Sequence, residues 1–295
     1  MDSEREESQS VDMAPVPQPI PLAAPTLELE GASPEKFLRA EKPGRSPANR
    51  SLERGIEILR AFRPGSELLG NAELAERTGL SRSTVSRLTQ TLVVSGYLQV
   101  EPRKRTYGLA PAVLSLAHAM RSGSTILSIA APRMRATSQA ERITVGLAAA
   151  DRDEMVYLES IRYNREASLR SIVSGQRVPM ELTSLGRAYL ARTPESRRKA
   201  LFTHFRQRRG SQWVDLELAL DTAIRAVHEQ GYCAASWQPE VVAVAAPLIF
   251  KGLQYALNVS LPTAEPFACV VRSLAPTLLA LKTRIQRELD AATDD

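Results

Sequence analysis

The 295-residue chain contains little cysteine and little histidine, with two residues of the first and three of the second. Two cysteines do not make a disulfide framework, and the spacing of Cys233 and Cys269 fits no metal motif. We therefore expect two reduced, mostly buried thiols, no metal site and no cofactor. The histidines, His118, His204 and His228, fall on predicted helical stretches, and none stands near a candidate nucleophile in the sequence.

Long apolar runs and common catalytic motifs are also missing. No run reaches the roughly 18 apolar residues of a transmembrane helix, and the acidic start MDSEREES is unlike a signal peptide. We therefore expect a soluble cytoplasmic protein without a membrane partner. No GxSxG, P-loop, GxGxxG or HExxH pattern occurs. Cys233 with a distant histidine could imitate a thiol catalyst, but a buried structural cysteine is the simpler interpretation. No catalytic residue is assigned, and we do not expect an enzyme.

Positive charge is present and unevenly distributed. The net charge is +5 and the calculated pI is about 9.4, which permits nucleic-acid binding. Residues 1–48 carry five basic and nine acidic side chains, whereas residues 49–122 carry eleven basic and six acidic ones. The remaining residues carry 22 basic and 18 acidic side chains. The basic excess is therefore densest between residues 49 and 122.

This basic segment contains AELAERTGLSRSTVSRLTQTL, which has the pattern of two short helices joined by a tight turn. Gly79 stands where the first helix must end, because glycine tolerates the left-handed conformation of a C-terminal cap. Ser81 stands at the N-cap of the second helix, where its hydroxyl can accept a hydrogen bond from a free N–H. Val85, Leu88 and Leu92 then form one apolar stripe at helical spacing. The segment therefore predicts a helix-turn-helix.

Polar and basic side chains point away from that stripe. Small hydroxyls let a helix approach the floor of the major groove, while arginine and glutamine can make bidentate contacts to guanine or adenine edges. The following GYLQVEPRKRTYGL predicts a hairpin whose basic tip rests on phosphates. The expected DNA contacts of this winged helix-turn-helix are Arg82, Ser83, Thr84, Ser86, Arg87, Gln90, Arg103, Lys104, Arg105 and Tyr107. The alternative is a solvated helical domain of mixed charge that binds another protein.

The chain divides into four predicted segments. Residues 1–48 hold eight of the nineteen prolines and are expected to be a disordered tail, or else a tether for a partner. Residues 49–110 form the winged domain. Residues 111–123 form a linker helix whose apolar face packs on a second subunit, or on its own chain. Residues 124–293 form an α+β domain of short antiparallel strands and flanking helices around a small cavity.

Patterning places the elements of this last segment. TVGLAAAD and EMVYLESI predict strands that meet at Arg152 and Asp153, and ASLRSIV adds an extended run. VVAVAAPLIF and QYALNVSLP predict a hairpin that turns at Lys251 and Gly252. Helices are expected near 125–141, 183–193, 195–205, 215–230 and 274–291. The basic run from Arg197 to Arg209 is interpreted as a solvated face, with a second nucleic-acid contact as the alternative.

The order of these parts resembles the IclR family of bacterial transcriptional regulators over about residues 50–292. The matching segments are SLERGIEIL, AELAERTGLSRSTVSRLTQTL, GYL, YGLAP, GQRVPMELTSLGRAYLA, QGY, VAVAAP and NVSLP. The resemblance implies a winged helix-turn-helix, a dimerising linker helix and a C-terminal effector domain with a GAF-like antiparallel sheet. Such regulators bind double-stranded palindromic operators as homodimers or tetramers, act as repressors or activators, and respond to small metabolites, often organic or aromatic acids.

The resemblance also implies an effector site. The backbone amides of Ser184 and Leu185 would meet the carboxylate of the ligand, and a helix N-terminus attracts anions in any protein. Asn258 and Ser260 alternate along the last strand and so share one face, with Ala243 across the pocket.

Four positions depart from the pattern of the family. Glu181 stands where histidine is frequent, Gln238 replaces an acid, Glu240 replaces a glycine, and Ala235 lies near a missing polar contact. Glu181 belongs to the predicted site: facing the cavity, it would oppose an anionic effector unless an arginine pairs with it, whereas it could also point outward. The two functional predictions are a ligand-responsive DNA-binding regulator and a winged-helix dimer whose degenerate sensor domain regulates without a small ligand.

Overall fold

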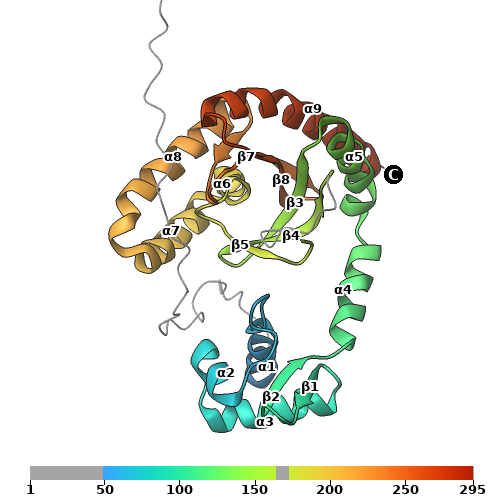
Figure 1. Ribbon diagram of the computed structural model, residues 1–295, viewed down its shortest axis with the longest axis vertical. Coiled ribbons are helices and arrows are strands. Elements are labelled where there is room, and N and C mark those ends of the chain that lie inside the picture. The colour runs from blue at the N-terminus through green and yellow to red at the C-terminus, as the bar shows by residue number, and fades with distance from the viewer. Residues whose placement is uncertain (1–48, 164–172, 295) are drawn as a thin grey trace, which may run out of the picture.

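The computed structural model describes residues 49–163 and 173–294, and its helices and strands form two domains joined by one helix (Figure 1). The predicted tail of residues 1–48 and nearly all of ASLRSIV lie outside the described residues. The first part, called the winged domain below, contains α1 (Arg50–Arg60), α2 (Asn71–Thr78), α3 (Arg82–Val94), β1 (Leu98–Glu101) and β2 (Thr106–Leu109).

Local chemistry explains the turn between α2 and α3. Gly79 ends α2 with a φ of 67°, the left-handed conformation that the sequence predicts there. The hydroxyl of Ser81 accepts a hydrogen bond from the N–H of Thr84 at 3.3 Å and caps α3. Val85 is fully buried in a small core with Ile58 and Leu74, which fixes α3 against α1 and α2.

A single helix, α4 (Ala112–Ser122), connects the winged domain to the second domain (Figure 1). None of its residues is buried, and Leu114, Leu116 and Met120 expose more than half of their surface. The prediction that the apolar face of this helix packs within its own chain is therefore wrong for the described residues.

The second part, called the sheet domain below, is built on six antiparallel strands in the order β5-β4-β3-β8-β7-β6. Together with the winged domain it confirms the predicted α+β fold class. The strands are β3 (Thr144–Asp151), β4 (Glu154–Ile161), β5 (Arg177–Pro179), β6 (Cys233–Ala235), β7 (Val241–Phe250) and β8 (Leu253–Pro262). The helices are α5 (Thr125–Glu141), α6 (Ser184–Arg192), α7 (Glu195–Arg209), the short η1 (Gly210–Gln212), α8 (Trp213–Gln230) and α9 (Phe267–Asp294).

Helices cover both faces of this sheet. Residues of α5 and α9 pack with large aliphatic side chains on one face, and residues of α6 and α8 pack on the other. In Figure 1, α9 runs along the outer edge of the sheet domain, while α6 lies inside the curve formed by the strands. The sheet therefore separates two cores, and only the second includes the start of α6.

Several expectations need correction. The short strands β5 and β6 were not predicted, and α9 begins at Phe267 and continues through Pro276 rather than starting near residue 274. Cys233 is buried as expected, but Cys269 is exposed. The basic run of α7 is only partly a solvated face, because its last two arginines bind a buried carboxylate.

Candidate functional site

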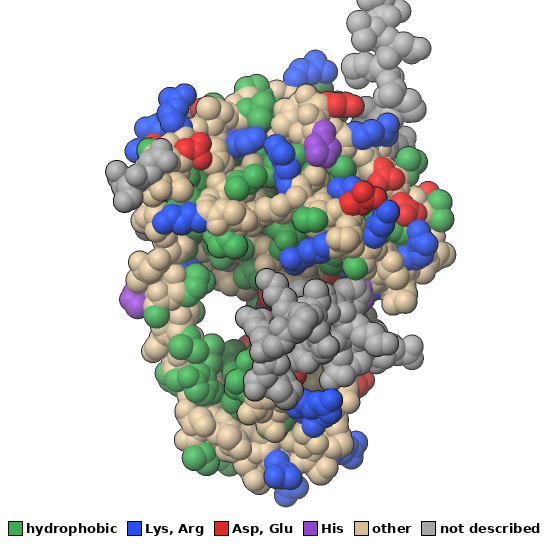
Figure 2. All heavy atoms as spheres, turned by 180° about the vertical axis from the view of Figure 1, so that it is seen from behind, with side chains coloured by type: hydrophobic (Ala, Val, Ile, Leu, Met, Phe, Trp, Pro, Cys, Tyr) green, Lys and Arg blue, Asp and Glu red, His purple; other side chains and the backbone are tan. Residues whose placement is uncertain are grey.

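The predicted DNA-contacting residues lie at the end of the winged domain that faces away from the sheet domain. Figure 1 shows α3 and the β1–β2 hairpin there, with α1 between them and the sheet domain. The side chains of Arg82, Ser83, Arg87 and Gln90 on α3 are exposed, as are Arg103, Lys104 and Arg105 in the hairpin turn. Figure 2 shows separate basic side chains at the same end of the molecule, and others spread over the sheet domain.

Three predicted contacts are less accessible. Thr84, Ser86 and Tyr107 are half-buried. The hydroxyl of Thr84 lies 2.9 Å from that of Ser81, inside the cap of α3. The backbone of Tyr107 exchanges two hydrogen bonds with Leu69, at 2.9 and 3.0 Å, and its ring packs on the core of the winged domain. Thr84 and Tyr107 thus lie partly within the winged domain, whereas the cations of the predicted DNA-binding surface are exposed.

The helix α6 begins at the residues predicted to hold an effector. Thr183 caps it by accepting a hydrogen bond from the N–H of Gly186 at 3.2 Å and donating one to the carbonyl of Pro179 at 2.9 Å. The amides of Ser184 and Leu185 lie in the first turn, where a helix provides no backbone acceptor. Both residues are buried, so this turn presents N–H groups inside the domain.

Close packing fixes α6 at this place. A Cβ atom at Gly186 would lie 1.9 Å from the carbonyl oxygen of Met180, a distance that no side chain permits. Glycine is therefore required for the helix to rest on the segment that precedes it. A movement of the first turn of α6 would therefore also move residues 180–183.

Small residues lie across the sheet on the same side as α6. The strand pairings place Gly146, Asn258, Ala245 and Cys233 in one row, and the next row contains Ser260, Ala243 and Ala235. The Sγ atom of Cys233 donates to the carbonyl of Ser184 at 3.4 Å, which ties this face of the sheet to the first turn of α6. The structure thus brings five of the six predicted effector residues to one face, namely Ser184, Leu185, Ala243, Asn258 and Ser260.

One polar atom in this region lacks a partner. Asn258 is 4% exposed, and its side-chain Oδ1 accepts no hydrogen bond from the described residues. Such a group is costly to bury, because it has lost its water without a replacement. Gly146 makes room for it, since a Cβ there would lie 2.4 Å from Oδ1 and 2.5 Å from the ring of Tyr157. Burial raises the pKa of Tyr157 well above its ordinary value, although a hydrogen bond with Asn258 partly opposes this rise.

Arg187 is a further residue of this site that the sequence analysis did not single out. It follows the first turn of α6, and its Nε donates to the backbone carbonyl of Glu181 at 3.3 Å. Burial lowers its pKa, while the neighbouring Cys233 and Glu181 act in the opposite direction. A cation near a helix N-terminus opposes the helix dipole, and this unfavourable placement is the signal by which the sequence could have singled out Arg187.

Glu181 does not point outward, because its side chain is fully buried. Its Oε1 accepts hydrogen bonds from Arg208 Nη2 at 2.9 Å and from Arg209 Nη2 at 2.6 Å. Two guanidinium groups thus compensate its charge, and the predicted repulsion of an anionic effector is removed. Its carboxylate is occupied by these two arginines rather than open to a ligand.

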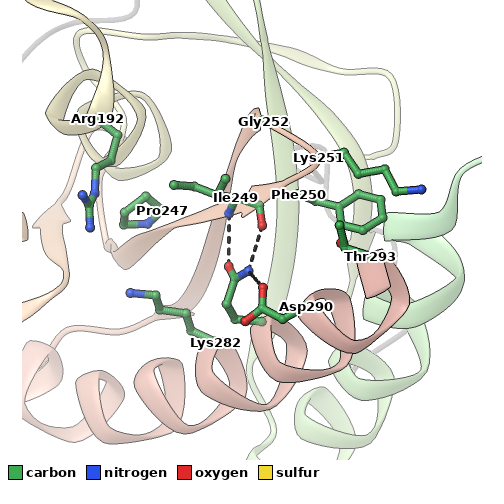
Figure 3. A pocket seen from close by; sticks show the side chains of 10 residues that line it. Arg192, Pro247, Ile249, Phe250, Lys251, Gly252, Lys282, Asp290 and Thr293 are labelled. Atoms are coloured by element: carbon green, nitrogen blue, oxygen red, sulfur yellow. Dashed lines mark hydrogen bonds between the residues drawn. The ribbon is translucent and has the colours of Figure 1, made fainter. Parts of the chain in front are cut away.

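A surface hollow of about 570 Å³ lies elsewhere, beside the turn between β7 and β8 (Figure 3). Arg192 and Lys282 point toward it, and Pro247 lies between them. The side-chain nitrogen of Gln286 at its edge donates to the carbonyl of Ile249 at 2.8 Å and to Asp290 at 2.7 Å. None of the predicted effector residues lines this hollow.

Within residues 49–163 and 173–294, no group of histidine, cysteine or acidic side chains is arranged to hold a metal ion. In the same ranges, no helix is long and apolar enough to cross a membrane.

Comparison with known proteins agrees with this arrangement. Residues 51–102 match the model of the IclR helix-turn-helix domain, and residues 118–283 match that of the C-terminal part of the bacterial transcriptional regulator IclR. The chain is 35% identical over 251 residues to the HTH-type transcriptional regulator TsaQ1/TsaQ2 of Comamonas testosteroni, covering 82% of this chain and 89% of that protein.

Solved structures show the same fold. An IclR family transcriptional regulator from Brucella abortus has a TM-score of 0.76 and 34% identity, with 82% of this chain and 93% of that chain covered. An IclR homologue from Microbacterium hydrocarbonoxydans, solved in complex with 4-hydroxybenzoate, has a TM-score of 0.60 at 22% identity, with coverages of 80% and 99%.

Proposed function

The chain belongs to the IclR family of bacterial transcriptional regulators, and we propose that a small organic or aromatic acid controls its binding to DNA. Its curated relatives are transcriptional regulators and not enzymes. The observation that carries the proposal is the unpaired, buried Oδ1 of Asn258 on the face of the sheet that packs against the first turn of α6.

We propose one orientation for an acid at this site. Its carboxylate would accept hydrogen bonds from the amides of Ser184 and Leu185, and the charge of Arg187 would support it. Its body would lie against the small alanines of the sheet, and a hydroxyl on the ring would donate to Asn258 Oδ1. An anion is therefore the favoured ligand despite the presence of Glu181.

For DNA, we place α3 in the major groove and the β1–β2 turn on the flanking phosphates. The exposed face of α3 offers Arg87 and Gln90 to base edges, while Arg103 and Lys104 extend from the turn. We propose a homodimer joined through α4, because a second copy would bury its exposed apolar side chains Leu114, Leu116 and Met120. Figure 2 shows exposed hydrophobic side chains on the part of the molecule that links the two domains. Two winged domains related by a twofold axis read a palindrome.

The DNA part is tested by selecting bound fragments from a random pool at near-physiological salt. Enrichment of one inverted repeat supports a sequence-specific dimer. With this operator, Arg87→Ala reduces discrimination against random DNA. Arg103→Ala instead lowers the affinity for operator and random DNA equally, and it makes the affinity less dependent on salt concentration. Equal losses on both DNAs for Arg87→Ala would contradict the assignment of α3 to base reading.

The effector part is tested by thermal unfolding with 4-hydroxybenzoate and benzoate at fixed protein concentration. A ligand at 100 times its dissociation constant stabilises the folded state by about 2.7 kcal/mol. We expect a rise in Tm for the parent protein that is lost in Arg187→Gln. If neither acid nor related aromatic acids shift the Tm, the alternative of a sensor domain that regulates without a small ligand is favoured.

A further inference from the structure

The turn between β3 and β4, residues 151–154, carries four consecutive charged residues and is called the charged turn below. Three of them bind the winged domain. Arg60 Nη2 donates to Asp151 at 2.5 Å, and Arg63 Nη1 donates to Glu154 at 2.6 Å. Arg152, with the opposite sign, binds Glu57 on α1. Each of these three charges of the turn therefore faces a charge of opposite sign on the winged domain.

The charged turn is held rigidly on the sheet domain. Arg152 has a φ of 60°, which sets the sharp reversal of the backbone. Arg177 on β5 binds Asp151, and its Nη1 donates to Glu154 at 3.1 Å. The side chains of Asp151, Glu154 and Arg177 expose between 17 and 30% of their surface. Such a shared and partly buried network holds its geometry better than isolated surface pairs do.

The fourth residue, Asp153, points the other way, toward α7. It accepts a hydrogen bond from Arg208 Nη1 at 2.7 Å and lies 3.2 Å from Nε2 of His204. Burial alone would raise the pKa of Asp153, but the hydrogen bond with His204 and the charge of Arg208 hold it well below its ordinary range. Asp153 is thus an ionised anchor for the guanidinium of Arg208.

Arg208 continues the connection to the start of α6. Its Nη2 donates to Glu181 Oε1 at 2.9 Å, so one guanidinium joins Asp153 of the charged turn to the buried Glu181. Glu181 lies two residues before Thr183, the cap of α6, in the segment on which Gly186 packs. Arg209 binds Glu181 as well, but no bond from Arg209 reaches Asp153 in the described residues.

We propose that the charged turn positions the winged domain on the sheet domain, and that Glu181 and Arg208 connect this placement to the first turn of α6. The inference rests on the proposed function, since the first turn of α6 is the proposed effector site. A ligand that displaces the first turn of α6 also displaces Glu181. Arg208 can then no longer keep its hydrogen bonds with both Glu181 and Asp153. The response requires that the ligand binds the docked and undocked arrangements with different affinity.

The test is a distance measurement between the two domains in the full chain. Spin labels are placed at Val94→Cys on α3 and Val214→Cys on α8, both strongly exposed positions, in a Cys269→Ser background. Labelled chain is diluted into excess unlabelled chain before assembly, so that one assembly carries one labelled pair. We expect a narrow distance distribution in the parent protein.

The first variant set removes the charges of the turn. Asp151→Asn, Arg152→Gln and Glu154→Gln together should reduce the population at the parent distance by at least half. The control is Glu195→Gln with Lys199→Gln, an exposed ion pair on α7, which should leave the distribution unchanged. A distribution in the triple variant that coincides with the parent would overturn the positioning role.

The second set separates the relay from general stability. Arg208→Gln breaks contacts with both Asp153 and Glu181, whereas Arg209→Gln breaks only contacts with Glu181. With both variants shown to be folded by circular dichroism, only Arg208→Gln should broaden the distribution. Equal distributions for the two variants would overturn the relay. No DNA or ligand is present, so this failure differs from failure of the proposed function.

Discussion

The two faces of the six-stranded sheet use the same strands but different side chains. The face under α5 and α9 is aliphatic and tightly filled, with Val145, Leu147, Val244, Leu257 and Val259 all fully buried. The face under α6 has Gly146, Ala148, Ala245, Ala256 and Asn258 at the neighbouring positions of the same strands. Alternation along each strand thus separates a face of large aliphatic side chains from a face of small side chains with an unpaired polar atom.

This difference explains how the domain can carry a binding surface without losing its stability. On the face under α5 and α9, the strands themselves contribute large aliphatic side chains to the hydrophobic core. The other face can then tolerate small residues and a costly unsatisfied amide oxygen. Substitutions at adjacent residues of one strand should therefore differ in their effects on the free energy of unfolding and on ligand binding.

The largest effect on folding is expected for Leu257→Ala on the aliphatic face. Leu257 is fully buried, and its removal leaves a cavity that the neighbouring strands cannot close. The free energy of unfolding should fall by about 2–5 kcal/mol. Urea unfolding at one protein concentration measures the change. A loss below about 1 kcal/mol would show that this face is not the stabilising one.

A smaller loss is expected for Gly146→Ala on the opposite face. The new Cβ would meet Asn258 Oδ1 and the ring of Tyr157, and both side chains would have to move. We expect a loss of about 1–3 kcal/mol in the free energy of unfolding. Gly123→Ala is the matched control, because its Cβ would meet only a backbone oxygen at 3.4 Å and its φ of −83° suits alanine. The prediction fails if both variants are equally stable.

Asn258→Ala should change the free energy of unfolding by less than about 1 kcal/mol, because the loss of its hydrogen bond with Tyr157 is offset by removal of a buried acceptor, Oδ1, that has no partner. Its effect should instead appear in ligand binding. The affinity for an acid found by thermal unfolding should fall about tenfold, as expected for the loss of one hydrogen bond of about 1.4 kcal/mol. Titration calorimetry measures the affinity, and unchanged binding would remove Asn258 from the site.

The two thiols test the burial of the α6 face without any substitution. Burial raises the pKa of Cys233 to about 12, whereas Cys269 is exposed. Since the thiolate is the reactive form, burial and the raised pKa make Cys233 far less reactive than an exposed thiol. Iodoacetamide at pH 8 should therefore label Cys269 alone, and both residues in urea. Rapid labelling of Cys233 in the native protein would show that the α6 face is open.

Much of this architecture follows from local sequence. Gly79 and Ser81 determine the turn before α3, and the β7–β8 hairpin turns at Lys251 and Gly252 as predicted. Alternation along β8 correctly placed Asn258 and Ser260 on one face. These features depend on a few neighbouring residues, so capping and periodicity are sufficient to find them.

Contacts between distant segments could not be predicted in the same way. Glu181 and Arg208 are 27 residues apart, and nothing in either local pattern identifies the other as its partner. The strand β6 has only three residues, too few for a periodic signal, and it exists because β7 provides a partner. The position of Arg187 near a helix N-terminus can be read from the sequence, but its burial beside Cys233 and Glu181 cannot.

The helix α4 has a consequence for the behaviour of the protein at low concentration. An isolated helix of this length is marginally stable in water, and α4 has no buried residue in a single chain. If a second copy covers its apolar side, folding of the linker and association of the subunits become one event. The abundance of the regulator then acts as an input alongside any metabolite: below the association threshold the two winged domains search DNA independently, and above it they bind as a pair.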